Sequence, residues 1–199
     1  MTTTESPAVP VPAPAGADRR RLYRVAGLDI SLTGTGIATA GGTTRVPTRG
    51  HRKDSLVARR NRIKLIADVV VTEVGNVDLA AVEGPVSYSQ PGGSTWDRAG
   101  LWWQIVDRLI GRDIPVAVIP PTCRAKYATG NGGARKAAVL EAAQRRYGAI
   151  LASDDEADAL ILRAMGCHFL GQPLADVPTG HGVALVGCQW PDLGTEAAS

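Results

Sequence analysis

A short apolar run reads Val25-Ala26-Gly27-Leu28-Asp29-Ile30 and carries a single carboxylate near its end. A second apolar run, Leu79-Ala80-Ala81-Val82-Glu83, also ends in an acid. Runs of this length and composition are typical of strands that are buried in a sheet. A carboxylate at the end of a buried strand costs free energy unless a charged group pairs with it. The two runs therefore predict two buried strands whose acids need a positive partner.

Two more acids lie three residues apart at the start of a late helical stretch. Asp155 and Asp158 stand at positions i and i+3, so they lie on one face of a helix. The alanines of this stretch would let the helix lie close to a sheet. We therefore expect all four acids to converge on a shared cation. Asp154 is an alternative to Asp155 if the helix starts one residue earlier.

A cluster of carboxylates suggests phosphoryl chemistry, because Mg²⁺ prefers oxygen ligands. Two such ions roughly 3.5–4 Å apart support an in-line phosphodiester displacement, in which one activates water and the other stabilises the leaving 3′ oxygen. Without cations the acids would repel one another, and some would stay protonated. Structural interpretations also exist: Asp29 as a turn residue, Glu83 as a strand end, and the helix acids as charges that suit the helix dipole.

Length and composition indicate one ordinary globular domain. The chain has 199 residues, of which 44% are hydrophobic and 21% charged. We expect a disordered Pro/Ala-rich tail at 1–21, a domain at 22–190 with a C-terminal extension from about 171, and a flexible tail at 191–199. No apolar run approaches the ~20 residues of a membrane span. The absence of a signal-peptide core and three cysteines without CxxC spacing favour the cytoplasm.

The predicted elements alternate in a pattern that indicates an α/β fold. Three strands at the start, joined by a tight turn at 34–36, are expected to be antiparallel. They are followed by helix, strand, helix, strand and helices, which predicts two further parallel strands and a mixed five-stranded sheet with helices on both faces. The strands are expected at 24–32, 36–40, 43–47, 79–83 and 116–119, and an extra one at 183–188. The helices are expected at 55–74, 95–109, 134–147 and 155–169, the first capped by Asp54 or Ser55.

Basic residues are concentrated in the segment that runs from the third strand into the first helix. The formal net charge is only +3, so the distribution says more than the total. A cluster of this kind is typical of a phosphate-binding surface, although a solvated helix face has the same composition. The cluster contains Arg45, Arg49, Arg52, Lys53, Arg59, Arg60, Arg62 and Lys64.

The motifs around the four acids resemble those of the RuvC family of Holliday-junction resolvases, especially its phage members. The matching segments run from about residue 24 to 169. The element order is that of the RNase H-like fold, to which this family belongs. The segments are Gly27-Leu28-Asp29-Ile30-Ser31 with Thr35-Gly36-Ile37-Ala38, then Ala81-Val82-Glu83-Gly84-Pro85, Lys126-Tyr127-Ala128-Thr129-Gly130 with Arg135-Lys136, and Asp155-Glu156-Ala157-Asp158-Ala159-Leu160.

The resemblance implies a Mg²⁺-dependent endonuclease that cuts branched DNA, typically four-way junctions, and leaves 5′-phosphate and 3′-hydroxyl ends. By motif position, Asp29, Glu83, Asp155 and Asp158 would hold two Mg²⁺ ions, for which Mn²⁺ is expected to substitute. Lys136 would lie near the scissile phosphate, where a cation neutralises developing charge. Residues expected to bind DNA are Lys126, Arg135 and Lys136, Tyr88 as a base-stacking aromatic, and Arg52, Lys53 and Arg59. A phage origin would place the protein in the host cytoplasm.

The resemblance also implies a homodimer formed through the 95–110 helix. Adjacent tryptophans on a helix point about 100° apart. We therefore expect one of Trp102 and Trp103 to pack in the core and the other at the dimer contact. The alternative is a monomer in which the C-terminal segment covers the second tryptophan.

Three other functions are compatible with parts of the sequence. Asp29-Ile30-Ser31-Leu32-Thr33-Gly34 loosely resembles the first phosphate loop of actin-like ATPases, which need two such domains and a longer chain. A non-catalytic DNA-binding relative would not need the complete set of acids. A nuclease that acts on RNA or on flaps would share the phosphate chemistry and differ in substrate selection.

Overall fold

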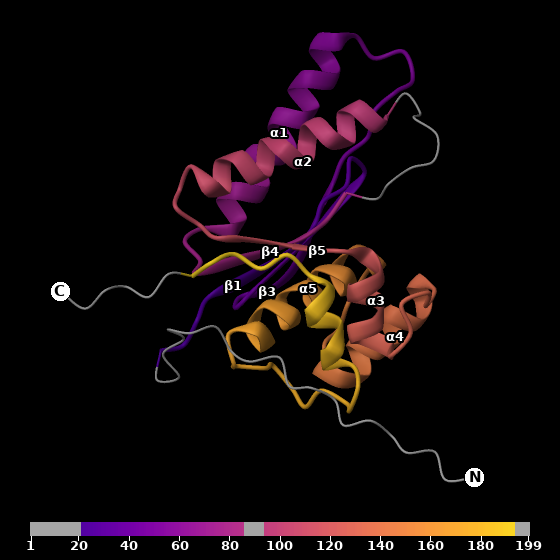
Figure 1. Cartoon of the computed structure of the whole chain (residues 1–199). Helices are drawn as coiled ribbons and strands as arrows, with labels where there is room; N and C mark the ends of the chain where they lie inside the picture. Colours follow the sequence, from indigo (N-terminus) through magenta and orange to yellow (C-terminus); the bar gives the residue numbers. More distant parts are fainter. Residues whose placement is uncertain (1–20, 86–93, 194–199) are drawn as a thin grey trace, which may run out of the picture.

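The computed structural model describes residues 21–85 and 94–193, which form a five-stranded sheet between two layers of helices (Figure 1). The sheet order is β3-β2-β1-β4-β5. The strands are β1 (Val25–Asp29), β2 (Gly34–Thr39), β3 (Gly42–Pro47), β4 (Leu79–Glu83) and β5 (Val116–Ile119). The helices are α1 (Leu56–Val74), α2 (Thr95–Ile110), α3 (Pro121–Thr129), α4 (Lys136–Tyr147), α5 (Asp154–Phe169) and the short 3₁₀ helix η1 (Gly182–Gly187).

The strand directions confirm the predicted mixed sheet and place two of the acids side by side. β1, β2 and β3 are antiparallel neighbours, whereas β1, β4 and β5 run parallel. In the β1–β4 register, Leu28 lies opposite Val82. Asp29 and Glu83 are the next residues of these two strands, so both acids emerge at the same edge of the sheet.

Helices cover both faces of the sheet, as predicted. Side chains alternate between the faces of a strand, so Ala26 and Leu28 of β1 join one core with Ile66 of α1 and Leu101 of α2. The other face is covered by α5, which contacts β1, β2 and β4, and α3 and α4 pack against α5. Figure 1 shows α1 and α2 on one side of the sheet and α3, α4 and α5 on the other.

Glycines allow α5 to lie directly on the sheet. A Cβ added at Gly27 would collide with the backbone of α5 at Ala159 and Arg163, and one added at Gly36 would collide with the carbonyl of Asp155. Ala159 itself is fully buried. The predicted tight turn at 34–36 is therefore wrong, because these residues belong to β2. At Gly36 an added Cβ would meet the backbone of α5, and at Gly34 it would meet the side chains of Arg45 and Asp155.

The turn that precedes β2 is made by residues 31–33 and is fastened by Thr35. The Thr35 hydroxyl donates to the carbonyl of Ser31 at 2.8 Å and accepts from its N–H at 3.2 Å. Ser55, one of the two predicted caps of α1, accepts from the N–H of Ala58. These local hydrogen bonds set where β2 and α1 begin.

Two elements after β5 differ from the sequence prediction. The helix α3 was not predicted; its first residue, Pro121, has a fixed φ that suits a helix start. The extra strand predicted at 183–188 is the 3₁₀ helix η1 instead. Ala184 and Leu185 are buried as a consecutive pair, which fits a helical turn rather than the alternation of a strand. Only Gln189 pairs with the sheet here, through a bridge to Val118.

The sequence prediction also concerned the two tryptophans of α2 and the two chain ends. Trp102 packs against the core and Trp103 is 63% exposed; in the described part of the C-terminal segment, Gln189 lies beside β5, where it pairs with Val118. Of the predicted tails, residues 1–20 and 194–199 lie outside the described residues, and Arg21 forms an ion pair with Asp78 at 2.5 Å. Within the described segments, no helix combines the length and apolar character that crossing a membrane requires.

The glycine contact predicts that Gly27→Ala destabilises the fold, because the added methyl group pushes α5 away from the sheet. We expect the free energy of unfolding, measured by urea denaturation, to fall by about 1–3 kcal/mol, the usual cost of overpacking a core. Gly41→Ala is the matched control, since a Cβ there meets only the hydroxyl of Thr39 at 3.6 Å. Equal stability of the two variants would contradict the close packing of α5.

Candidate functional site

Three of the four predicted acids converge where β1, β4 and α5 meet. One carboxylate oxygen from each of Asp29, Glu83 and Asp158 lies within 4.8 Å of the other two. Asp29 and Glu83 end neighbouring parallel strands, and Asp158 lies one turn into the helix that rests on them. Asp158 is only 2% exposed. The structure therefore forms a buried acidic triad from sequence segments that are far apart.

The other acids at the start of α5 have different partners. Asp155 Oδ2 lies 2.5 Å from Nε of Arg45 on β3, and Asp154 Oδ2 lies 2.7 Å from Nζ of Lys136. The helix begins at Asp154, and the hydroxyl of Ser153 accepts from the N–H of Glu156 at 3.2 Å. Neither Asp154 nor Asp155 belongs to the triad, although Asp155 lines the same cavity as Asp29 and Glu83.

An arginine that was not among the predicted site residues lies against the triad. Nε of Arg124, on α3, is 3.1 Å from Glu83 Oε2, and its Nη1 forms an ion pair with Asp158 Oδ1. The side chains of Arg124, Glu83 and Asp158 are only 10%, 12% and 3% exposed. One signal in the sequence points to this residue: β5 is parallel to β4 with Ile119 opposite Glu83, so the residues after β5 emerge beside the acids.

Burial raises the pKa of each acid in the triad. The pKa of Asp29 rises to about 8, first because of burial and then because of the negative charge of Glu83. Burial is also the largest cause for Asp158, whose pKa rises to about 7 although Arg124 opposes the shift. The pKa of Glu83 is raised by burial and lowered by Arg124.

The donor set of the triad fits a hard divalent cation. All three groups offer carboxylate oxygens, which Mg²⁺ and Ca²⁺ prefer over nitrogen or sulfur ligands. Their raised pKa values show that the acids lack sufficient positive charge nearby, because burial penalises the ionised form. A cation would supply that charge and keep the carboxylates ionised.

A cavity of about 530 Å³ opens beside the acids. Asp29 and Glu83 line one side of it, and Arg62, Trp102 and Lys136 contribute to its other walls. Nε1 of Trp102 donates to the backbone carbonyl of Glu83 at 2.9 Å, which fixes the end of β4. The pKa of Lys136 is raised, first by its hydrogen bond to Asp154, so this amine is protonated at neutral pH. The cavity thus has an acidic end and cationic walls.

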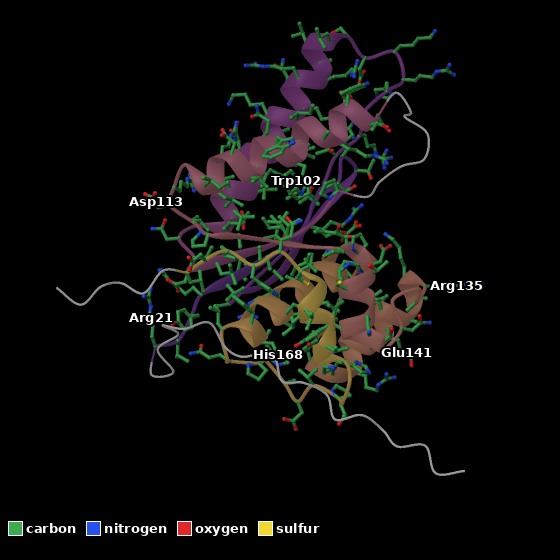
Figure 2. The ribbon with its side chains drawn as sticks, viewed as in Figure 1. Arg21, Trp102, Asp113, Arg135, Glu141 and His168 are labelled. Carbon is green, nitrogen blue, oxygen red and sulfur yellow. The ribbon has the colours of Figure 1, made fainter. Side chains whose placement is uncertain are left out.

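The remaining predicted DNA-binding residues are spread over both helical layers. Arg52 and Lys53 are exposed in the β3–α1 connection, whereas Arg59 forms a bidentate ion pair with Asp97, at 2.6 and 2.8 Å, that ties α1 to α2. Lys126 is exposed on α3, and Arg135 is exposed just before α4. Figure 2 shows Arg135 in the helical layer opposite that of Trp102. Tyr88 lies outside the described residues.

Two solved structures to which this chain is similar are of RuvC proteins. RuvC of Thermus thermophilus is 20% identical, with a TM-score of 0.55, over 78% of this chain and 99% of that one. The same organism's RuvC in complex with a Holliday junction substrate is 19% identical, with a TM-score of 0.58, over 79% of this chain and all of the other. The sequence matches no protein-family model and no curated protein. The comparisons confirm the predicted RNase H-like fold, which this chain shares with RuvC.

The raised pKa values predict that cation binding strengthens with pH. Below about 7 and 8, Asp158 and Asp29 hold protons that an incoming ion must displace. We expect the Kd for Mn²⁺, measured by titration calorimetry, to be about tenfold or more higher at pH 6 than at pH 8.5, since each displaced proton changes affinity about tenfold per pH unit.

Asp68→Asn is the control for this measurement. Asp68 is an acid of α1 whose pKa is lowered by its hydrogen bonds to Lys64 and Arg108, so it is ionised throughout this range. Its variant should show the same pH dependence as the unaltered protein. An affinity that stays constant between pH 6 and 8.5 would contradict protonation of the triad.

Proposed function

We propose that the protein is a divalent-metal-dependent endonuclease that cuts branched DNA, with four-way junctions as its substrate. The observation that carries the proposal is the buried triad of Asp29, Glu83 and Asp158 at the strand ends of a fold shared with RuvC. The structure of the Thermus thermophilus protein with a Holliday junction supports the substrate class. We further propose that the products carry 5′-phosphate and 3′-hydroxyl ends.

Asp29, Glu83 and Asp158 would hold a first Mg²⁺ ion, and Asp155 would contribute to a second after leaving Arg45. Bound Mg²⁺ supplies an activated water and stabilises the leaving 3′ oxygen. Mn²⁺, which accepts the same oxygen ligands, would substitute for it. The assignment of Asp155 rests on its place in the lining of the shared cavity.

The cavity walls supply groups that bind and orient the substrate. Nζ of Lys136 is a cation at the cavity and would neutralise charge on the scissile phosphate. Arg62 is held by a bond from its Nε to the hydroxyl of Thr48 at 3.2 Å, which presents a second cation from α1. Trp102 keeps the Glu83 carboxylate in place through the backbone.

Exposed basic residues would extend the binding surface beyond the cavity. Arg52 and Lys53 precede α1 at one side of the sheet, and Lys126 and Arg135 lie in the other helical layer. A branched substrate has several duplex arms, so cations on two layers suit it better than a single stripe. Arg59 is paired with Asp97 of α2, so it would hold α1 against α2 rather than bind a phosphate by itself.

The protein would act as a homodimer through α2. This helix exposes Trp96, Trp103 and Ile110, which are 78%, 63% and 57% accessible. Large apolar side chains gathered on one exposed helix are typical of an interaction surface. A symmetric dimer would carry two active sites, which symmetric cutting of a four-way junction requires.

The nuclease prediction is tested with a labelled four-way junction, a linear duplex and an RNA–DNA hybrid, each with Mg²⁺ or EDTA. We expect Mg²⁺-dependent cutting of the junction and a rate roughly 10²–10³ lower in Glu83→Gln and Asp158→Asn, as for loss of one group that stabilises the transition state. Asp68→Asn is the control, since Asp68 pairs with Lys64 and Arg108 away from the triad.

The substrates separate the alternatives. Cutting that survives both substitutions would overturn the triad as the active site. Preferential cutting of the hybrid would favour an RNA-directed nuclease, and junction binding without cutting would favour a non-catalytic DNA-binding protein.

The dimer proposal predicts that Trp103→Glu lowers the mass in solution from dimer to monomer, because a charge replaces an apolar contact. Light scattering coupled to gel filtration measures this mass. Ile150→Glu is the control, since Ile150 is 99% exposed and does not lie on α2. A monomer in the unaltered protein at micromolar concentration would contradict the proposal.

A further inference from the structure

We propose that Arg124 is a resident counter-ion of the acidic triad, which a divalent cation must displace from Glu83 and Asp158 when it binds. The inference rests on the proposed metal site and concerns how that site is filled. Arg124 then sets the cation concentration at which the protein becomes active.

Arg124 engages the oxygens that a cation would use. Its Nε lies 3.1 Å from Oε2 of Glu83, its Nη2 donates to Oε1 at 3.4 Å, and its Nη1 pairs with Oδ1 of Asp158. Mg²⁺ binds oxygens at about 2.1 Å, so ligands around one ion lie about 3 Å apart. Arg124 faces both oxygens of Glu83 and one oxygen of Asp158, so an ion bound by Glu83 needs an oxygen that the guanidinium already contacts. The two cations therefore compete for Glu83 and Asp158.

Because of burial, it is costly to leave either Arg124 or the carboxylates without a partner of opposite charge. The Arg124 side chain is 10% exposed, and the carboxylate of Asp158 is 3% exposed. Charges this deeply buried require a partner, and removing one partner leaves the other uncompensated. One guanidinium carries a single positive charge against three carboxylates, whereas a divalent ion carries two. Arg124 thus stabilises the metal-free site but leaves part of the negative charge of the three carboxylates uncompensated.

The helix that carries Arg124 is anchored, so only its side chain is expected to move. The neighbouring Tyr127 is fully buried, and Arg146 of α4 donates to the carbonyls of Tyr127 and Ala128 at 2.9 and 2.7 Å. Within the described residues, Nε of Arg124 is a buried atom without a hydrogen bond, although it lies close to Glu83. The two terminal nitrogens of Arg124 donate hydrogen bonds to Asp158 and Glu83, so every contact of the guanidinium that is described here is to a carboxylate that a cation would also bind.

The first test measures Mn²⁺ affinity in Arg124→Gln and Arg124→Lys by titration calorimetry, with thermal unfolding in parallel. We expect the Kd for Mn²⁺ to fall about tenfold or more in Arg124→Gln, because a positive charge beside the ion is removed. Arg124→Lys should change the Kd less. Without metal, Arg124→Gln should unfold at a lower temperature, and Mn²⁺ should raise its Tm more than that of the unaltered protein.

Arg108→Gln is the matched control. Arg108 also forms an ion pair with an aspartate, Asp68 at 2.5 Å, but lies in the α1–α2 layer. This variant should bind Mn²⁺ as the unaltered protein does. Unchanged or weaker Mn²⁺ affinity in Arg124→Gln would overturn the competition.

A second measurement uses the unaltered chain, so it does not depend on a variant that folds. An arginine-selective dicarbonyl reagent, followed by peptide mass spectrometry, reports the accessibility of each guanidinium. We expect saturating Ca²⁺ or Mn²⁺ to increase labelling of Arg124 about fivefold or more, because displacement exposes a buried group. Labelling of Arg108 should stay constant. Equal or lower labelling of Arg124 with metal would overturn the displacement.

The outcomes distinguish this inference from the proposed function. Tighter Mn²⁺ binding by Arg124→Gln in a protein that cuts no DNA would support the counter-ion and overturn the nuclease. Metal-dependent cutting of DNA, with equal Mn²⁺ affinity in Arg124→Gln and in the unaltered protein, would support the nuclease and overturn the counter-ion. Failure of every variant and of the unaltered protein to bind Mn²⁺ would overturn both.

Discussion

The concentration of negative charge at one buried edge of the sheet is the constraint on which the site depends. Asp29 and Glu83 end neighbouring strands, and α5 brings Asp158 to them. Each acid would be costly there alone. The protein reduces this cost in two ways at once, through protonation, which the raised pKa values reflect, and through the guanidinium of Arg124. A bound cation can replace both the protons and the guanidinium group.

The acids can approach one another because glycines, which have no side chain, stand where α5 meets the sheet. Gly27 and Gly36 give α5 room to rest on the backbone of β1 and β2. Ala159 continues this close contact from the helix side. A larger residue at any of these positions would enlarge the separation between Asp158 and the strand acids. The apolar packing of α5 and the chemistry of the site therefore share one interface.

Much of the architecture follows from local patterns in the sequence. The apolar runs that end at Asp29 and Glu83 locate two central strands, and their parallel pairing follows from the intervening helix. Periodicity locates α1, α2 and α5 to within a few residues. Glycine misled the prediction at 34–36, because a glycine needed for a turn and one needed for close packing are identical in sequence.

The parts that sequence patterns miss are those decided by tertiary contacts. Arg124 became a site residue only because α3 follows β5 at the acidic edge, and α3 has too few residues for a clear helical period. Asp155 illustrates the same limit. Its i, i+3 relation to Asp158 is correct. Its carboxylate, however, pairs with Arg45 of β3, which is 110 residues away along the chain.

The seating of α5 on glycines also has a dynamic consequence. Because α5 buries many of its side chains and also lies on these glycines, we expect it to separate from the sheet as a unit, which would move Asp158 away from Asp29 and Glu83 while the strands stay paired. The geometry of the acidic triad would then be lost in a local fluctuation that costs less than global unfolding. Amide hydrogen exchange along α5 would consequently report the fraction of molecules in which the acids are assembled.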